Sequence, residues 1–138
     1  MSARRLCALA LGAVLLAAAL PKLLDPPGFA QVLFHYRLFP EGSRHALALV
    51  VPWLELWMGL ALISGKGETG AARLTLPLML AFATAIGINL WRGNPIDCGC
   101  FGVGPARTAA EKLAAMRWEV ARDLLFAALA LPLLRRVP

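Results

Sequence analysis

The chain is poor in charged residues. Asp, Glu, Lys and Arg make up only 16% of its 138 residues, whereas 59% are hydrophobic and the mean hydropathy is +0.68. Soluble domains carry roughly 25% charged residues, so this composition excludes an ordinary soluble domain and is typical of a protein embedded in a lipid bilayer. A chain of this length predicts a single domain, residues 1–138.

Cysteine and histidine are scarce as well. The three cysteines, Cys7, Cys98 and Cys100, are too few for a disulfide framework. Neither His35 nor His45 stands at a ligand spacing from a cysteine, and no further cysteine completes a four-ligand site, so the favoured interpretation has no metal. Two thiolates with an imidazole nevertheless suit soft metals, so soft-metal handling stays an alternative.

Basic residues are in excess, with a net charge of +6, but they do not indicate nucleic acid. They are scattered or flank apolar runs, without a basic cluster interleaved with aromatic residues. Flanking arginines are instead topology signals. The compact pairs Arg4–Arg5 and Arg135–Arg136 predict cytoplasmic termini in a bacterial inner membrane, although the other two loops carry more basic residues in total at lower density.

Four apolar runs dominate the sequence, at residues 6–24, 46–63, 74–91 and 118–134. Each is close to the roughly 20 helical residues that cross a hydrocarbon core of about 30 Å. The first run follows basic residues, as in a signal peptide, but its apolar character continues past Lys22, which favours a retained helix. We therefore predict an all-α integral membrane four-helix bundle.

The connections between these runs predict further elements. Asp25-Pro26-Pro27-Gly28 ends the first helix, and an apolar face at helical spacing then predicts a short amphipathic helix on the membrane surface. That face consists of Phe29, Val32, Leu33 and Tyr36. Residues 64–72 are expected to form a polar connection.

A second helix start is predicted before the fourth run. Thr108 and Glu111 form a capping box, so a helix is expected to begin at Thr108 and to continue into the fourth run. Arg122 and Asp123 then fall one turn inside the start of that run, at the depth of the membrane interface.

The most distinctive motif is Asp97-Cys98-Gly99-Cys100-Phe101-Gly102. Cysteines one residue apart can come within the Cα separation that a disulfide requires, and Gly99 relieves part of the backbone strain of so small a ring. Strained, accessible disulfides are labile and oxidising. The motif therefore indicates a redox pair, with unpaired thiols or half of a metal site as the alternatives.

Charged neighbours bear on the reactivity of this pair. Arg92, Arg107, Arg117 and Arg122 are expected to surround the loop and to stabilise a thiolate, whereas Asp97 disfavours one. Cys7 is single and is predicted at the opposite face of the membrane, so it cannot relay electrons. Two routes for resetting the pair remain: a quinone among the helices, or a soluble thioredoxin-like partner.

Glu55 lies near the middle of the second apolar run. A carboxyl group at that depth costs roughly 2.5 kcal/mol or more, so we expect Glu55 either to be protonated or to pair with a cation, with Lys22 as the first candidate. Counting residues places Glu55 about 15 Å below the outer start of its helix, which is long for a direct pair. The favoured interpretation is therefore a protonated Glu55 that donates a hydrogen bond and handles a proton, for instance for a quinone head group; a structural hydrogen bond is the alternative.

Several short segments together resemble one family, that of the methylamine utilisation protein MauE and its DoxX-like relatives. These segments are Lys22-Leu23, Asp25-Pro26, Tyr36-Arg37-Leu38-Phe39-Pro40, Pro52-Trp53-Leu54-Glu55-Leu56, Gly59, Arg92-Gly93 and the cysteine hexapeptide. The resemblance implies a redox-associated four-helix membrane protein that acts beside a periplasmic thioredoxin-like protein. It further implies a disulfide-containing client, which for MauE proper is the small subunit of methylamine dehydrogenase.

Together these features predict a membrane thiol–disulfide redox protein whose Cys98–Cys100 pair faces the extracytoplasmic side. The enzyme activity that fits this pair is that of a thiol–disulfide oxidoreductase. A non-catalytic assembly partner, in which the cysteines only stabilise a loop, is the alternative from another class.

Overall fold

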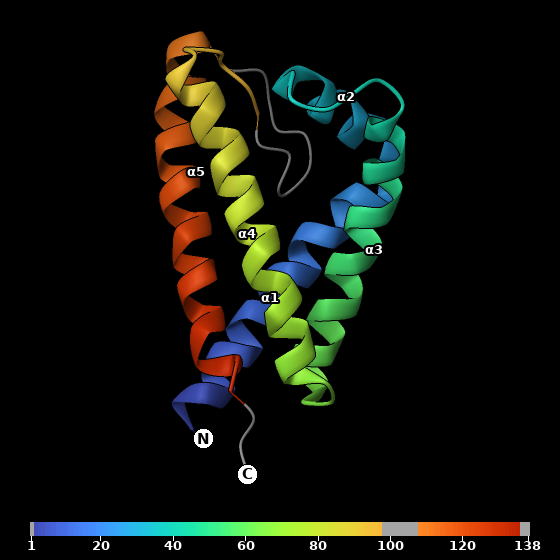
Figure 1. The fold of residues 1–138 in the computed structure, drawn as a ribbon, viewed down its shortest axis with the longest axis vertical. Helices are drawn as coiled ribbons and strands as arrows, with labels where there is room; N and C mark the ends of the chain where they lie inside the picture. The colour runs from blue at the N-terminus through green and yellow to red at the C-terminus, as the bar shows by residue number, and fades with distance from the viewer. Residues whose placement is uncertain (1, 98–107, 136–138) are drawn as a thin grey trace.

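A computed structural model describes residues 2–97 and 108–135. This part of the chain contains the helices α1 (Ala3–Leu24), α2 (Pro26–Tyr36), α3 (Ser43–Ser64), α4 (Glu68–Trp91) and α5 (Ala109–Ala130), followed by the short 3₁₀ helix η1 (Leu131–Leu133). Figure 1 shows α3, α4 and α5 along the long axis, α1 crossing behind them at a tilt, and α2 lying across one end. The start of α1 and η1 lie at the other end.

Three of the described helices are long and apolar enough to cross a membrane. They are α1, α3 and α4, with 22, 22 and 24 residues and apolar windows of mean hydropathy 2.1, 2.0 and 1.7. Many of their large apolar side chains point outward, including Trp53 at 56% and Trp57 at 72% exposure, as expected for helices that face lipid. The chain is therefore a membrane protein. α5 is equally long but contains Arg117, Glu119, Arg122 and Asp123.

The helix boundaries differ from the expected ones mainly around the third run. α4 begins at Glu68, six residues before position 74, so the expected polar connection over residues 64–72 shortens to Gly65–Gly67. Gly65 ends α3 with φ of 78° and Gly67 precedes α4 with φ of 74°, values that glycine adopts without a Cβ clash. Glu68 then lies in the first turn of α4, where the helix dipole favours a carboxylate.

α2 begins where the sequence suggested only a stop. Pro26 and Pro27 occupy the first positions of the helix, where the missing N–H groups have no helical partner to lose. The Asp25 carboxylate caps the same helix, because its Oδ1 accepts a hydrogen bond from the Gly28 N–H at 3.1 Å. One short segment thus ends α1 and starts α2.

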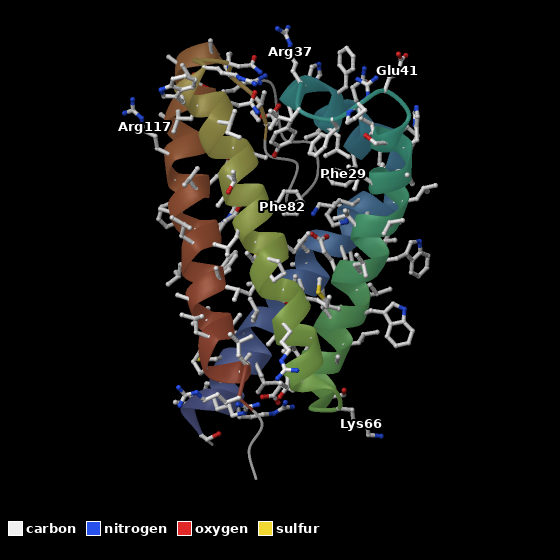
Figure 2. The ribbon with its side chains drawn as sticks, viewed as in Figure 1. Phe29, Arg37, Glu41, Lys66, Phe82 and Arg117 are labelled. Atoms are coloured by element: carbon white, nitrogen blue, oxygen red, sulfur yellow. The ribbon has the colours of Figure 1, made fainter. Side chains whose placement is uncertain are left out.

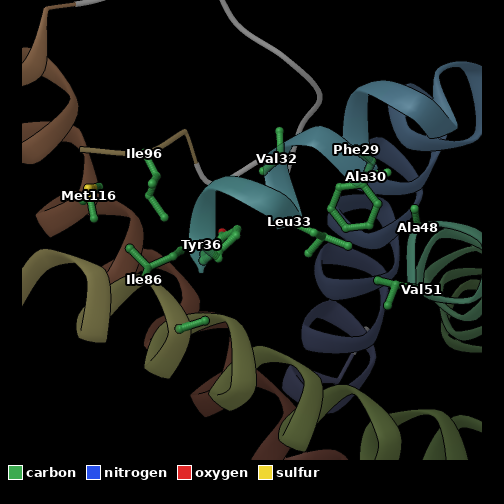
Figure 3. Close-up of a cluster of buried hydrophobic side chains, with 11 residues drawn as sticks. Phe29, Ala30, Val32, Leu33, Tyr36, Ala48, Val51, Ile86, Ile96 and Met116 are labelled. Carbon is green, nitrogen blue, oxygen red and sulfur yellow. The ribbon is translucent and has the colours of Figure 1, made fainter. Parts of the chain in front are cut away.

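The sequence predicted that the apolar face of α2 lies against the membrane, and this prediction is wrong. All four of its residues are buried by the protein itself, with Phe29 3% exposed and Tyr36 1%. They pack with Ala48 and Val51 of α3, Ile86 of α4 and Met116 of α5 (Figure 3). An apolar face at helical spacing fits lipid and protein equally well, so only the tertiary structure shows which of the two it contacts.

At the other end, two arginines of α1 tie several elements together. Arg4 Nε lies 3.1 Å from a Glu68 carboxylate oxygen, and its Nη1 donates to the carbonyls of Pro132 at 2.8 Å and Arg135 at 2.7 Å. Arg5 Nη1 donates to the Leu62 carbonyl at 2.9 Å. These contacts join the start of α1 to α3, α4 and the segment after α5.

α1 and α3 pack closely because two glycines let their backbones approach. A Cβ at Gly12 would lie 2.7 Å from Ile63 Cγ1 and 3.0 Å from the Gly59 carbonyl oxygen, and one at Gly59 would lie 3.1 Å from the Gly12 carbonyl oxygen. Small residues at such crossings are the usual means of packing helices in membranes, where lipid offers no hydrophobic drive for association.

We therefore expect Gly12→Ala to lower the free energy of unfolding by about 1–3 kcal/mol, because the added methyl group overpacks the α1–α3 contact. Gly87→Ala is the matched control, since a Cβ at that position of α4 meets nothing within 4 Å. It should be neutral or slightly stabilising, by up to about 1 kcal/mol, through helix propensity. Unfolding of both variants in mixed micelles, followed by circular dichroism, measures the difference; equal stabilities would show that the glycines do not set the helix spacing.

Candidate functional site

The interior of the molecule contains an ion pair between Lys22 of α1 and Glu55 of α3. The Lys22 Nζ donates to both carboxylate oxygens, at 2.8 Å and 2.9 Å. Both side chains are 1% exposed. A pair so fully removed from solvent is stable only when both groups keep good partners, because each ion has lost its hydration.

This geometry corrects the argument that Lys22 lies too far from Glu55 for a direct pair, because its ammonium group contacts both oxygens of Glu55. The residue count that argued against a direct pair measured depth from the end of the helix, but α2 covers that end and leaves Lys22 inside the protein. The side chains of Lys22 and Glu55 then extend toward each other between the antiparallel α1 and α3. The first candidate partner is the observed one.

Two aromatic rings complete the surroundings of Lys22. Its Nζ lies 5.1 Å from the centroid of Phe29 in α2 and 5.3 Å from that of Phe82 in α4. Both rings are labelled in Figure 2, where they lie well inside the molecule. A cation over a ring face is attracted by the quadrupole of the ring, most strongly where water is absent. Four helices therefore meet at this ammonium group.

α5 contributes a second buried pair of charges. Asp123 is 3% exposed, and its Oδ1 accepts hydrogen bonds from Arg122 Nε at 3.3 Å and Nη2 at 3.1 Å. The expectation that these two residues lie at the depth of the membrane interface stays a prediction. α5 begins at Ala109, as the Thr108 cap predicted, so both residues lie in the second half of the helix.

A small cavity of about 20 Å³ brings the two pairs together. Glu55, Arg122 and Asp123 all line it, and the rest of its wall is apolar, formed by Val14, Leu15, Ala18, Met79, Phe82 and Phe126. A volume of this size holds about one water molecule. We call Lys22, Glu55, Arg122 and Asp123 the interior charge cluster. In a membrane protein, such charges mark functional sites more often than structural ones.

A larger apolar cavity of about 560 Å³ lies between α2, α3 and α4. Among its lining residues only Tyr36 and Thr84 carry polar side-chain groups, and the Thr84 hydroxyl donates to the Leu80 carbonyl. Phe29 and Phe82 line this cavity as well as contacting Lys22. The cavity therefore adjoins the interior charge cluster through two aromatic rings.

The predicted redox pair Cys98–Cys100, with Gly99, lies outside the described residues, and so does the loop that the arginines were expected to surround. Of its neighbours, Asp97 has an Oδ2 3.6 Å from the Lys112 Nζ, and Arg92 follows the end of α4 at the surface. Cys7 is a partly buried free thiol in α1. Within residues 2–97 and 108–135, no group of three His, Cys, Asp or Glu side chains is placed to hold a metal.

Two features of the interior charge cluster were not predicted from sequence, the contact of Phe82 with Lys22 and the burial of Asp123. Phe82 is one of many apolar residues in α4 and carries no distinguishing signal. Asp123 was recognised only as a charge near the start of the fourth apolar run, and its burial depends on how α5 packs against the other helices.

These features define a class: a helical membrane protein with paired charges in its interior and a cysteine pair in one connection. The family model described as "Methylamine utilisation protein MauE" matches residues 2–136, and the chain belongs to the MauE family.

Curated proteins of that description are similar over much of the chain. The methylamine utilization protein MauE of Methylorubrum extorquens is 44% identical over 92 residues, which are 66% of this chain and 50% of that protein. The protein of the same description from Paracoccus denitrificans is 34% identical over 129 residues, which are 93% of this chain and 66% of that protein. The chain thus spans about half to two thirds of the length of these relatives. No solved structure matches it.

Proposed function

We propose that this protein is a membrane thiol–disulfide redox protein that assists disulfide formation or maturation in an extracytoplasmic client. The observation that carries the proposal is the Cys98-Gly99-Cys100 motif in a chain of the MauE family. In the exchange, a thiolate of one protein attacks the disulfide of the other and forms a mixed disulfide, which a second thiolate resolves. Two electrons and the disulfide bond pass between the proteins, and no other oxidant is consumed.

The partner in this proposal is a periplasmic thioredoxin-like protein. The printed description of the relatives, methylamine utilization, supports a client within amine metabolism, such as the disulfide-rich small subunit of methylamine dehydrogenase. A quinone is the other route for resetting the cysteines. The apolar cavity between α2, α3 and α4 supports a hydrophobic ligand of this kind, while its near lack of polar groups favours the isoprenoid tail over the quinone ring.

Trapping of the mixed disulfide tests the proposal. Cys98→Ala or Cys100→Ala removes one thiol, so the intermediate formed by the remaining thiol cannot be resolved and should accumulate. We expect one of these variants to carry a covalently attached thioredoxin-like protein, identified by mass spectrometry of non-reduced samples. The double variant should carry none, and Cys7→Ala should behave as the unmodified protein.

The opposing result would be no adduct in either single variant, with both cysteines of the unmodified protein open to alkylation under oxidising conditions. The role of a non-catalytic assembly partner would then replace the redox role. Stoichiometric metal that is lost in Cys98→Ala would instead favour soft-metal handling.

The proposed topology has α5 as the fourth membrane-crossing helix and both termini in the cytoplasm of a bacterial inner membrane. Arg4, Arg5, Lys66 and Arg135 gather at one end of the molecule, which supports a cytoplasmic end by the positive-inside rule. The end of α4 and the start of α5, which flank the cysteine motif in the sequence, lie at the opposite end.

A membrane-impermeant thiol reagent checks this topology. Applied to intact spheroplasts under reducing conditions, it should label Cys98 and Cys100. A Lys66→Cys substitution in a Cys7→Ala background provides an exposed thiol at the other end, and it should be labelled only after permeabilisation. The reverse pattern would invert the orientation and place the cysteine pair in the reducing compartment, where a stable disulfide is not expected.

A further inference from the structure

The two oxygens of the Asp123 carboxyl group have unequal surroundings. Oδ1 accepts both hydrogen bonds from Arg122, whereas Oδ2 is buried and accepts none from any described residue. A buried acceptor left without a donor costs roughly 1–3 kcal/mol, and more when it is charged. A proton on Oδ2 removes that cost, because the resulting O–H is a donor and the group is neutral.

The wall of the small cavity offers this O–H a place to donate. Glu55 and Asp123 line the same cavity of about 20 Å³, which has room for about one water molecule. The Glu55 oxygens already accept from Lys22, and a carboxylate oxygen has capacity for a second hydrogen bond. A water in the cavity, or Glu55 itself, can thus accept from a protonated Asp123.

Among the described residues, the positive and negative charges near Asp123 balance closely, so the ligand that fits this site is a proton. α1 presents Lys22, α3 presents Glu55, and α4 presents only Met79 and Phe82. On α5 itself lie Arg122 and, one turn earlier, the buried Glu119, which has its own contacts. With Lys22 so near, a metal cation would be repelled, whereas a proton adds a single charge without needing room for a coordination shell.

We propose that the interior charge cluster is a proton-binding site in which Asp123 carries an exchangeable proton beside an ionised Lys22–Glu55 pair. The step is the reversible protonation of one carboxylate by water, with one O–H bond formed or broken and no electron transferred. This assignment goes beyond the proposed redox role, since it concerns residues of the helices and does not depend on the cysteines.

Infrared spectroscopy of the protein in lipid bilayers tests the proposal, because a protonated carboxyl group has a C=O stretch separate from that of a carboxylate. We expect such a band at neutral pH, shifted by exchange into deuterated water. The band should be lost in Asp123→Asn and kept in the surface control Glu41→Gln. Loss in Glu55→Gln with retention in Asp123→Asn would move the proton to Glu55 and overturn the assignment.

Isotope labelling keeps the test valid if Asp123→Asn does not fold. In the unmodified protein, labelling the carboxyl carbon of Asp should shift the band, and labelling that of Glu should not. The absence of any such band, or its disappearance when sodium replaces potassium in the buffer, would contradict a proton site, the latter in favour of a cation site. A double Cys98→Ala/Cys100→Ala variant should keep the band even if the redox role fails.

Discussion

Replacing Lys22 with methionine is expected to lower the free energy of unfolding by about 3–5 kcal/mol. The substitution keeps much of the side-chain volume but leaves Glu55 buried without its cation, and removing one partner of a buried pair costs about this much. Denaturant unfolding in mixed micelles, followed by circular dichroism, measures the change.

The double variant Lys22→Met/Glu55→Leu distinguishes the effect of removing the whole ion pair from the effect of removing one of its charges. Because two apolar side chains of similar volume remove both charges, most of the lost stability should return. Lys66→Met is the matched control, since Lys66 is exposed in the α3–α4 connection, and it should change stability by less than about 0.5 kcal/mol. If the double variant were no more stable than the single one, the ion pair would be needed for a further contact, of which Asp123 is the nearest candidate.

The second large effect is expected at Phe29. This ring is 3% exposed and lies among α2, α3 and α4 while facing the ammonium group of Lys22. Phe29→Ala leaves a cavity and removes one ring from Lys22, so the free energy of unfolding should fall by about 3–5 kcal/mol. Differences in the melting temperature between the variant and the unmodified protein in the same micelles give the measurement.

The same helix offers a matched control for that substitution. Phe34 is 53% exposed, and its ring contacts Arg44, whose Cζ lies 4.6 Å from the ring centroid. Phe34→Ala should therefore cost no more than about 1 kcal/mol, the worth of an exposed cation–ring contact. Equal effects at Phe29 and Phe34 would mean that α2 does not pack against the protein interior as described.

The long helices could be predicted from sequence because their apolar runs match the thickness of a membrane. Lys22 and Glu55 were also identifiable, since each is a charge within or at the end of such a run, where an unpaired charge is expensive. The argument that Lys22 lies too far from Glu55 for a direct pair was wrong, because a depth count along one straight helix ignores the element that covers its end. The long side chain of Lys22 is what lets its ammonium group reach the Glu55 carboxylate.

The burial of α2 and the place of Asp123 could not be predicted in the same way. A helix with Phe29, Val32, Leu33 and Tyr36 on one face fits lipid and protein equally well, so its partner depends on how the longer helices are arranged. Arg122 and Asp123 stand near the start of the fourth apolar run, and the sequence does not show which neighbouring helices cover them. Both cases turn on the relative positions of helices, which hydrophobic periodicity does not contain.

The position of Arg4 in the first turn of α1 has a consequence for the order in which the contacts of the chain can form during synthesis. Arg4 donates to the carbonyls of Pro132 and Arg135, which follow it by 128 and 131 residues. A ribosome delivers α1 to the membrane early, but these two acceptors emerge only after α5 has been synthesised. Until then, the guanidinium group relies on water, lipid phosphate or Glu68. Among the described helices, α1 is therefore made first, and its end forms these two contacts last.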